Sequence, residues 1–163
     1  MPLASPIAVL FVCVVLFVAS ITDLKSRTIP NVLPGLLLLG FAIALFFTSD
    51  LRDVFLLRLA TFSVALLVGF LFFTFKVMGG GDVKLFATLA IWHDFTSLGH
   101  LAISTAFAGA GVALFFALMD FGRRYRAYTK KSSIWKVFRE SLKVRIPYGV
   151  GIFLGQLILF VQN

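Results

Sequence analysis

Long apolar runs constrain this chain more than any other feature of its sequence. Of its 163 residues, 60% are hydrophobic and only 13% are charged. A helix of roughly 20 apolar residues crosses a lipid bilayer, whereas a soluble fold of this length could not bury so much apolar surface. We therefore expect an all-α membrane protein that forms a single membrane-embedded domain over residues 1–163.

Six apolar segments are candidates for spanning helices, and they predict a six-helix bundle with both termini outside. The fourth segment is the weakest, because His93 and Asp94 interrupt its apolar stretch. We expect this helix to lie inside the bundle, away from lipid. The six segments cover about 4–22, 33–49, 54–75, 83–98, 101–120 and 147–161.

The last segment carries a pair of glycines with helical spacing. Gly151 and Gly155 form a GxxxG pattern on one helix face. Small residues at this spacing let two membrane helices approach closely. We expect the pair to make a close helix contact within the bundle.

The distribution of basic residues orients the bundle. Lysine and arginine are kept on the cytoplasmic side as apolar segments insert. Of the 15 basic residues, only Arg52 and Arg58 lie on the side of the termini; the others lie beside the loops that follow the first, third and fifth segments. Segments 23–31 and 79–84 are therefore predicted to face the cytoplasm together.

One cytoplasmic loop, about 121–146, holds most of the positive charge. Apolar residues recur there at helical spacing, which predicts an amphipathic helix in the membrane interface, with a disordered linker as the alternative. Because the charge adjoins membrane segments, anionic lipids are the expected partner and nucleic acid is not. The basic residues are Arg123, Arg124, Arg126, Lys130, Lys131, Lys136, Arg139, Lys143 and Arg145.

Two acids stand out at the membrane boundary. Asp23 ends the first segment, where the helix dipole disfavours an acid. Asp82 follows the glycines at 79–81, which we expect to allow close backbone approach and positive φ angles. Each acid also has a structural interpretation: Asp23 as a topological anchor balanced by Lys25 and Arg27, and Asp82 as a helix N-cap.

A pair of acids at one membrane depth on different helices can hydrolyse a peptide bond. If the carboxyls share a site, repulsion keeps one protonated while the other activates water. This chemistry requires no metal or organic cofactor. The remaining acids are interpreted as solvated or ion-paired, and the histidines are too few for a metal site; these residues are Asp50, Asp53, Asp94, Asp120, Glu140, His93 and His100.

Three motifs resemble the prepilin peptidases, the type IV leader peptidase branch of the GxGD membrane aspartyl proteases. The sequence DLKSRTIPN at 23–31 resembles the first aspartate motif, GGGDVKL at 79–85 the second, and RIPYG at 145–149 the turn into the last helix. The resemblance implies that Asp23 and Asp82 are catalytic. It implies substrate-binding or site-shaping roles for Lys25, Arg27, Pro30, Asn31, Gly79, Gly81, Lys84, Pro147, Tyr148 and Gly149.

The resemblance also implies a function. Such an enzyme removes a short basic leader from prepilin or pseudopilin precursors at the cytoplasmic face of the bacterial inner membrane. Larger members carry paired Cys-x-x-Cys motifs associated with methylation, whereas this chain has only Cys13. It is therefore similar to the short form that serves tight-adherence (Flp-type) pili, and no methyltransferase activity is expected.

Two alternatives remain at the level of sequence. A preflagellin peptidase or a presenilin-like intramembrane protease would use the same pair of acids. A non-catalytic assembly or transport protein would use Asp23 as an anchor and Asp82 as a cap.

Overall fold

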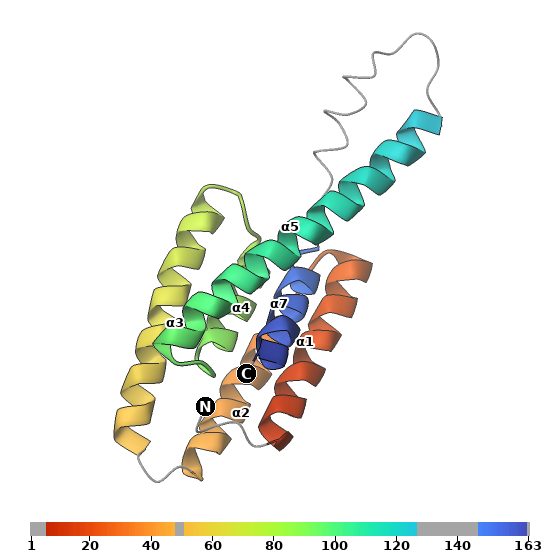
Figure 1. Cartoon of the computed structure of the whole chain (residues 1–163). Helices are drawn as coiled ribbons and strands as arrows, with labels where there is room; N and C mark the ends of the chain where they lie inside the picture. The colour runs from red at the N-terminus through yellow and green to blue at the C-terminus, as the bar shows by residue number, and fades with distance from the viewer. Residues whose placement is uncertain (1–5, 48–50, 127–146, 163) are drawn as a thin grey trace.

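The structure, a computed structural model, describes residues 6–47, 51–126 and 147–162, and all regular secondary structure in these ranges is helical (Figure 1). The all-α prediction is confirmed. The helices are α1 (Pro6–Ser26), α2 (Val32–Phe46), α3 (Leu51–Thr74), α4 (Gly80–Ala90), α5 (Phe95–Arg126) and α7 (Tyr148–Gln162). The interfacial helix predicted within 121–146 falls largely outside the described residues.

Three of these helices are long and apolar enough to cross a membrane: Pro6–Ser26, Val54–Thr74 and Phe95–Tyr125. Large apolar side chains are exposed along all three. Such a surface suits lipid rather than water, so the chain is a membrane protein. Helices α2 and α7 have 15 residues each, about 22 Å of helix, which is shorter than the roughly 30 Å of a bilayer core.

Helix α4 is short and enclosed. It has 11 residues and buries both faces, through Val83, Leu85, Ala87, Thr88, Leu89 and Ala90. The prediction that the fourth helix lies inside the bundle is confirmed.

The predicted bounds of the fourth and fifth segments were wrong. Helix α4 ends at Ala90 instead of near 98, and α5 runs 32 residues from Phe95 to Arg126 instead of 101–120. The break falls at His93 and Asp94. The backbone N–H of Ser97 donates to Asp94 Oδ1 at 2.7 Å, which caps the first turn of α5 and fixes its early start.

The C-terminal end of α4 lies among buried polar side chains. Carbonyls at a helix end have no partner within the helix and need donors from elsewhere. Thr61 Oγ1 of α3 lies 3.2 Å from the carbonyl oxygen of Ala90 and 3.3 Å from that of His93. His93 Nε2 lies 2.9 Å from Gln156 Oε1 of α7, and both side chains are only 1% exposed. These contacts tie α4 to α3 and α7.

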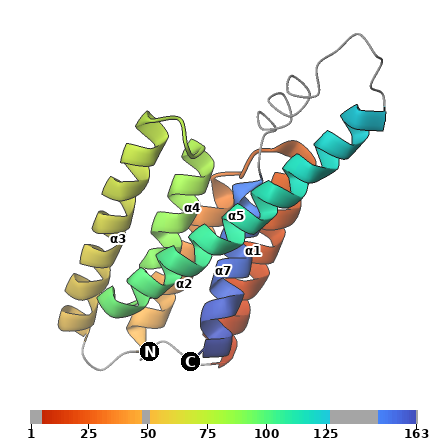
Figure 2. The same ribbon diagram turned by 45° about the horizontal axis from the view of Figure 1, so that its top comes forward.

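The helices bring two connections to one end of the bundle. In Figures 1 and 2, α1 ends and α4 begins at the same end, while α5 crosses the bundle at an angle and projects beyond it. Segments 23–31 and 79–84 therefore lie at one end of the molecule.

The glycine pair of α7 makes the predicted close contact, and its partner is α5. A Cβ on Gly151 would lie 2.8 Å from Gly109 Cα, and one on Gly155 would lie 2.6 Å from Thr105 Cα. Real Cβ atoms do not approach backbone so closely, so only glycine permits this helix spacing. The packing hypothesis for the GxxxG pair is confirmed.

We predict that replacing both Gly151 and Gly155 with Leu forces α5 and α7 apart and costs about 1–3 kcal/mol or more of stability. The measurement is the thermal unfolding midpoint in detergent. The matched control is Gly111→Leu, because nothing lies within 4 Å of a Cβ at Gly111. Equal midpoints for the double variant and the control would contradict the contact.

Candidate active site

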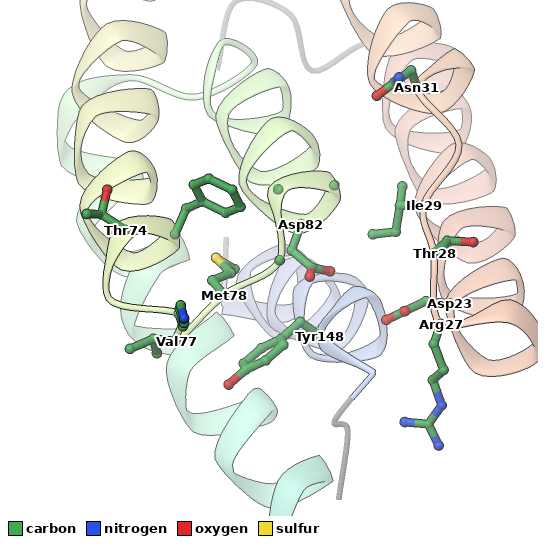
Figure 3. Close-up of a pocket in the computed structure, with 15 residues that line it drawn as sticks. Asp23, Arg27, Thr28, Ile29, Asn31, Thr74, Val77, Met78, Asp82 and Tyr148 are labelled. Carbon is green, nitrogen blue, oxygen red and sulfur yellow. The ribbon is translucent and has the colours of Figure 1, made fainter. Parts of the chain in front are cut away.

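An open cavity of about 1050 Å³ lies where the two connections meet (Figure 3). Its walls come from the end of α1, the α1–α2 and α3–α4 connections, and the first turns of α4 and α7. Both candidate acids line it. The lining residues are Asp23, Arg27, Thr28, Ile29, Asn31, Phe73, Thr74, Lys76, Val77, Met78, Gly79, Gly80, Gly81, Asp82 and Tyr148.

Asp23 is held by the start of α7. Its side chain is 5% exposed, and its Oδ2 accepts the backbone N–H of Gly149 at 2.8 Å. A Cβ on Gly149 would lie 3.1 Å from both Cβ and Oδ2 of Asp23 and 3.4 Å from the carbonyl oxygen of Ala19. Glycine therefore allows the N-terminus of α7 to reach the carboxylate, and Pro147 just before the helix suits its start.

Asp82 lies in the first turn of α4 and extends toward the same space as Asp23 (Figure 3). Its Oδ1 is buried and has no hydrogen-bond partner. Burial and then the charge of Asp23 raise the pKa of Asp82 to about 7, against an opposing effect of the backbone amides of Gly79 and Asp82. The Asp82 carboxyl is therefore substantially protonated at neutral pH.

The three glycines before Asp82 are not equivalent. A Cβ on Gly79 would lie 2.7 Å from Asp82 Oδ2, and one on Gly81 would lie 3.2 Å from Ile29 Cβ. A Cβ on Gly80 would meet only the Phe73 ring, at 3.4 Å. No described glycine has a positive φ, so the expectation of positive φ here was wrong. The first and third glycines therefore leave space for neighbouring groups, and none of the three has a backbone conformation that needs glycine.

The other predicted site residues divide into two groups. Arg27, Asn31 and Tyr148 line the cavity with the acids. Lys84 does not line it; its Nζ donates to Asn31 Oδ1 at 3.1 Å and so links α4 to the α1–α2 connection. The structure does not bring Lys25, Pro30 or Pro147 to the cavity wall: Lys25 and Pro30 are exposed, and Pro147 is buried behind Gly149.

Two basic residues on the cavity wall have left-handed backbone. Arg27 has φ 55° and Lys76 has φ 58°, a region that L-residues other than glycine and asparagine rarely adopt. Arg27 directly follows α1 and Lys76 is the second residue after α3, near the positions where glycine commonly ends a helix. The Arg27 guanidinium lies 5.2 Å from the Phe116 ring centroid of α5. Such outliers concentrate at functional sites.

Sequence reasoning missed part of the cavity wall. Lys76 counted only among the basic residues beside the loop after the third segment, although its place three residues before Gly79 could have suggested a wall position. Phe73 and Met78 carried no distinguishing signal in an apolar chain, whereas Ile29 lies within the motif at 23–31. Within the described residues, no three His, Cys, Asp or Glu side chains gather as a possible metal site.

Fold and cavity together define a helical membrane protein with two carboxyls at one end of its bundle. The family model of the type IV leader peptidase family matches residues 10–118, about two thirds of the chain, including both aspartate motifs. The chain therefore belongs to the type IV leader peptidase family, a family of proteases. No curated protein and no solved structure matched it.

We predict a fixed order of tolerance among the three glycines. Gly79→Ala displaces the Asp82 carboxyl and lowers peptidase activity roughly 100-fold, because small misplacements of reacting groups are costly. Gly81→Ala lowers peptidase activity by an intermediate factor. Gly80→Ala is the matched control, and its activity stays within a few-fold of that of the unsubstituted protein. Equal losses for all three variants at equal expression would contradict this steric explanation.

Proposed function

We propose that this chain is a membrane aspartyl endopeptidase that removes the short basic leader from type IV prepilin-like precursors at the cytoplasmic face of the bacterial inner membrane. The observation that carries the proposal is the convergence of Asp23 and Asp82, from α1 and α4, on one open cavity. Membership of the leader peptidase family supports the reaction class.

The two carboxyls supply what peptide hydrolysis needs. One carboxylate takes a proton from water as the water oxygen attacks the scissile carbonyl carbon, while the protonated carboxyl donates to the carbonyl oxygen. The resulting diol collapses: the leaving nitrogen takes the proton held by the first acid, and a diol hydroxyl returns a proton to the second. Both acids regain their starting states, so the cycle consumes only water and the peptide bond.

The form of the cavity suits an extended peptide. Backbone without side chains at 79–81 forms part of its wall, and the space above Asp82 is open. The scissile bond must lie beside both acids. In an α-helical substrate the backbone N–H and C=O groups are already hydrogen-bonded within the helix, so they cannot interact with the acids. We therefore expect the leader junction to bind unwound, while the hydrophobic helix of the precursor stays in the membrane.

Positive charge supports the proposed orientation. Arg27, Lys76 and Lys84 lie at the end of the bundle that holds the cavity, and exposed Arg123 and Arg124 lie on the projecting end of α5. Basic residues are retained in the cytoplasm and attract anionic lipid headgroups. We propose that α2, α4 and α7 complete a six-helix membrane domain whose termini lie outside.

Reporter fusions test this orientation. Fusions after Arg27 and after Lys76 are expected to report cytoplasm, because both positions lie at the basic end of the bundle. A fusion within 48–50, between α2 and α3, is expected to report the opposite side and serves as the control. An outside signal after Arg27 or Lys76 would reverse the proposed topology.

Conservative substitution of the acids tests the chemistry. Asp23→Asn and Asp82→Asn each remove a proton-transferring group at nearly constant shape, so each should lower cleavage of a coexpressed pilin precursor at least about 100-fold. The losses should not add, because the acids act as a unit. Asp120→Asn is the control, since Asp120 pairs with Arg124 away from the cavity. Unchanged cleavage by either folded dyad variant would refute the assignment.

A further inference from the structure

The two acids of the cavity have different surroundings. Asp23 accepts a hydrogen bond at 2.8 Å from the N–H of Gly149, in the first turn of α7, where the helix dipole favours negative charge. The positive charge of Arg27, four residues further along, also acts on Asp23. Both interactions favour a carboxylate over a carboxylic acid. They act against the burial of Asp23, which disfavours its charge and is the larger effect.

Asp82 has weaker support: the backbone amides of Gly79 and Asp82 favour its charge, but burial and the charge of Asp23 outweigh them. Its Oδ1 is buried without a donor. Burying a charged carboxylate oxygen without a hydrogen bond costs more free energy than burying the neutral, protonated form. The charge that acts on Asp82 is the negative one of Asp23. Lys76 lines the same cavity, but its side chain is exposed to solvent. The pKa of Asp82, raised to about 7, agrees with these contacts.

We propose that Asp23 carries the negative charge of the pair and is the general base that takes the proton from water, whereas Asp82 holds the shared proton and donates it to the scissile carbonyl oxygen. This assignment rests on the proposed function and adds to it which acid has which role. The proton taken by Asp23 then passes to the leaving nitrogen, and Asp82 recovers its proton from the diol.

The assignment gives the start of α7 a chemical role. Within the described part of the chain, the Gly149 N–H at the start of α7 donates to Asp23, so this helix end acts on one acid of the pair. Tyr148, the neighbouring titratable group on α7, also lines the cavity, and the proposed assignment gives it no proton to transfer. The asymmetry exists before substrate binds and does not depend on the identity of the substrate.

Infrared spectroscopy of the full chain in detergent tests the assignment without substrate. The C=O stretch of a protonated carboxyl is followed from pH 4.5 to 7.5 in Asp23→Asn, where Asp82 remains, and in Asp82→Asn, where Asp23 remains. The band should persist to higher pH in Asp23→Asn, by about one pH unit or more, which is tenfold in the protonation equilibrium. Asp120→Asn should leave the band of the unsubstituted pair unchanged.

Loss of the carboxyl band at the same pH in both variants would overturn the assignment. Persistence of the band to higher pH in Asp82→Asn than in Asp23→Asn would also overturn it. This outcome is separate from the fate of the proposed function. Precursor cleavage by the unsubstituted protein reports whether the chain is a leader peptidase, whereas the infrared order reports only where the proton resides.

Discussion

The repulsion between two carboxylates that line one cavity, with Asp23 buried and Asp82 partly buried, is the constraint on which the rest of this structure depends. Two like charges at such a site cannot both persist without compensation. The chain meets this constraint with unequal surroundings: Asp23 receives the N–H of Gly149, and the Oδ1 of Asp82 receives nothing. Under the proposed assignment, this difference keeps one proton on the pair, which is the state that acid–base hydrolysis requires.

Helix ends deliver these surroundings. Asp23 lies near the C-terminal end of α1, Asp82 in the first turn of α4, and Gly149 in the first turn of α7. Such convergence needs α4 to begin at the cavity and to stop inside the bundle, where Thr61 and the contact between His93 and Gln156 accommodate its other end. These polar residues at the far end of α4 therefore help to hold Asp82 in position at the cavity.

Much of this arrangement was predictable from the sequence, because apolar length and charged interruptions are strong signals in a membrane chain. They predicted the all-α fold, the enclosed fourth helix and the pairing of Asp23 with Asp82 at one end. They misplaced the break after α4, since apolar patterning does not reveal that Asp94 caps α5. They wrongly predicted positive φ angles at the glycines before Asp82, whereas the predicted close approach is seen at Gly81 against Ile29.

The contact between Gly149 and Asp23 also has a consequence for biosynthesis. Asp23 and Gly149 are separated by 126 positions, and α7 is the last of the described helices to leave the ribosome. Until α7 inserts, Asp23 lacks its donor, His93 lacks Gln156, and the close packing of α5 on Gly151 is absent. A nascent chain that already contains both acids therefore does not yet have the contact that α7 gives to Asp23, and insertion of α7 determines when that contact forms.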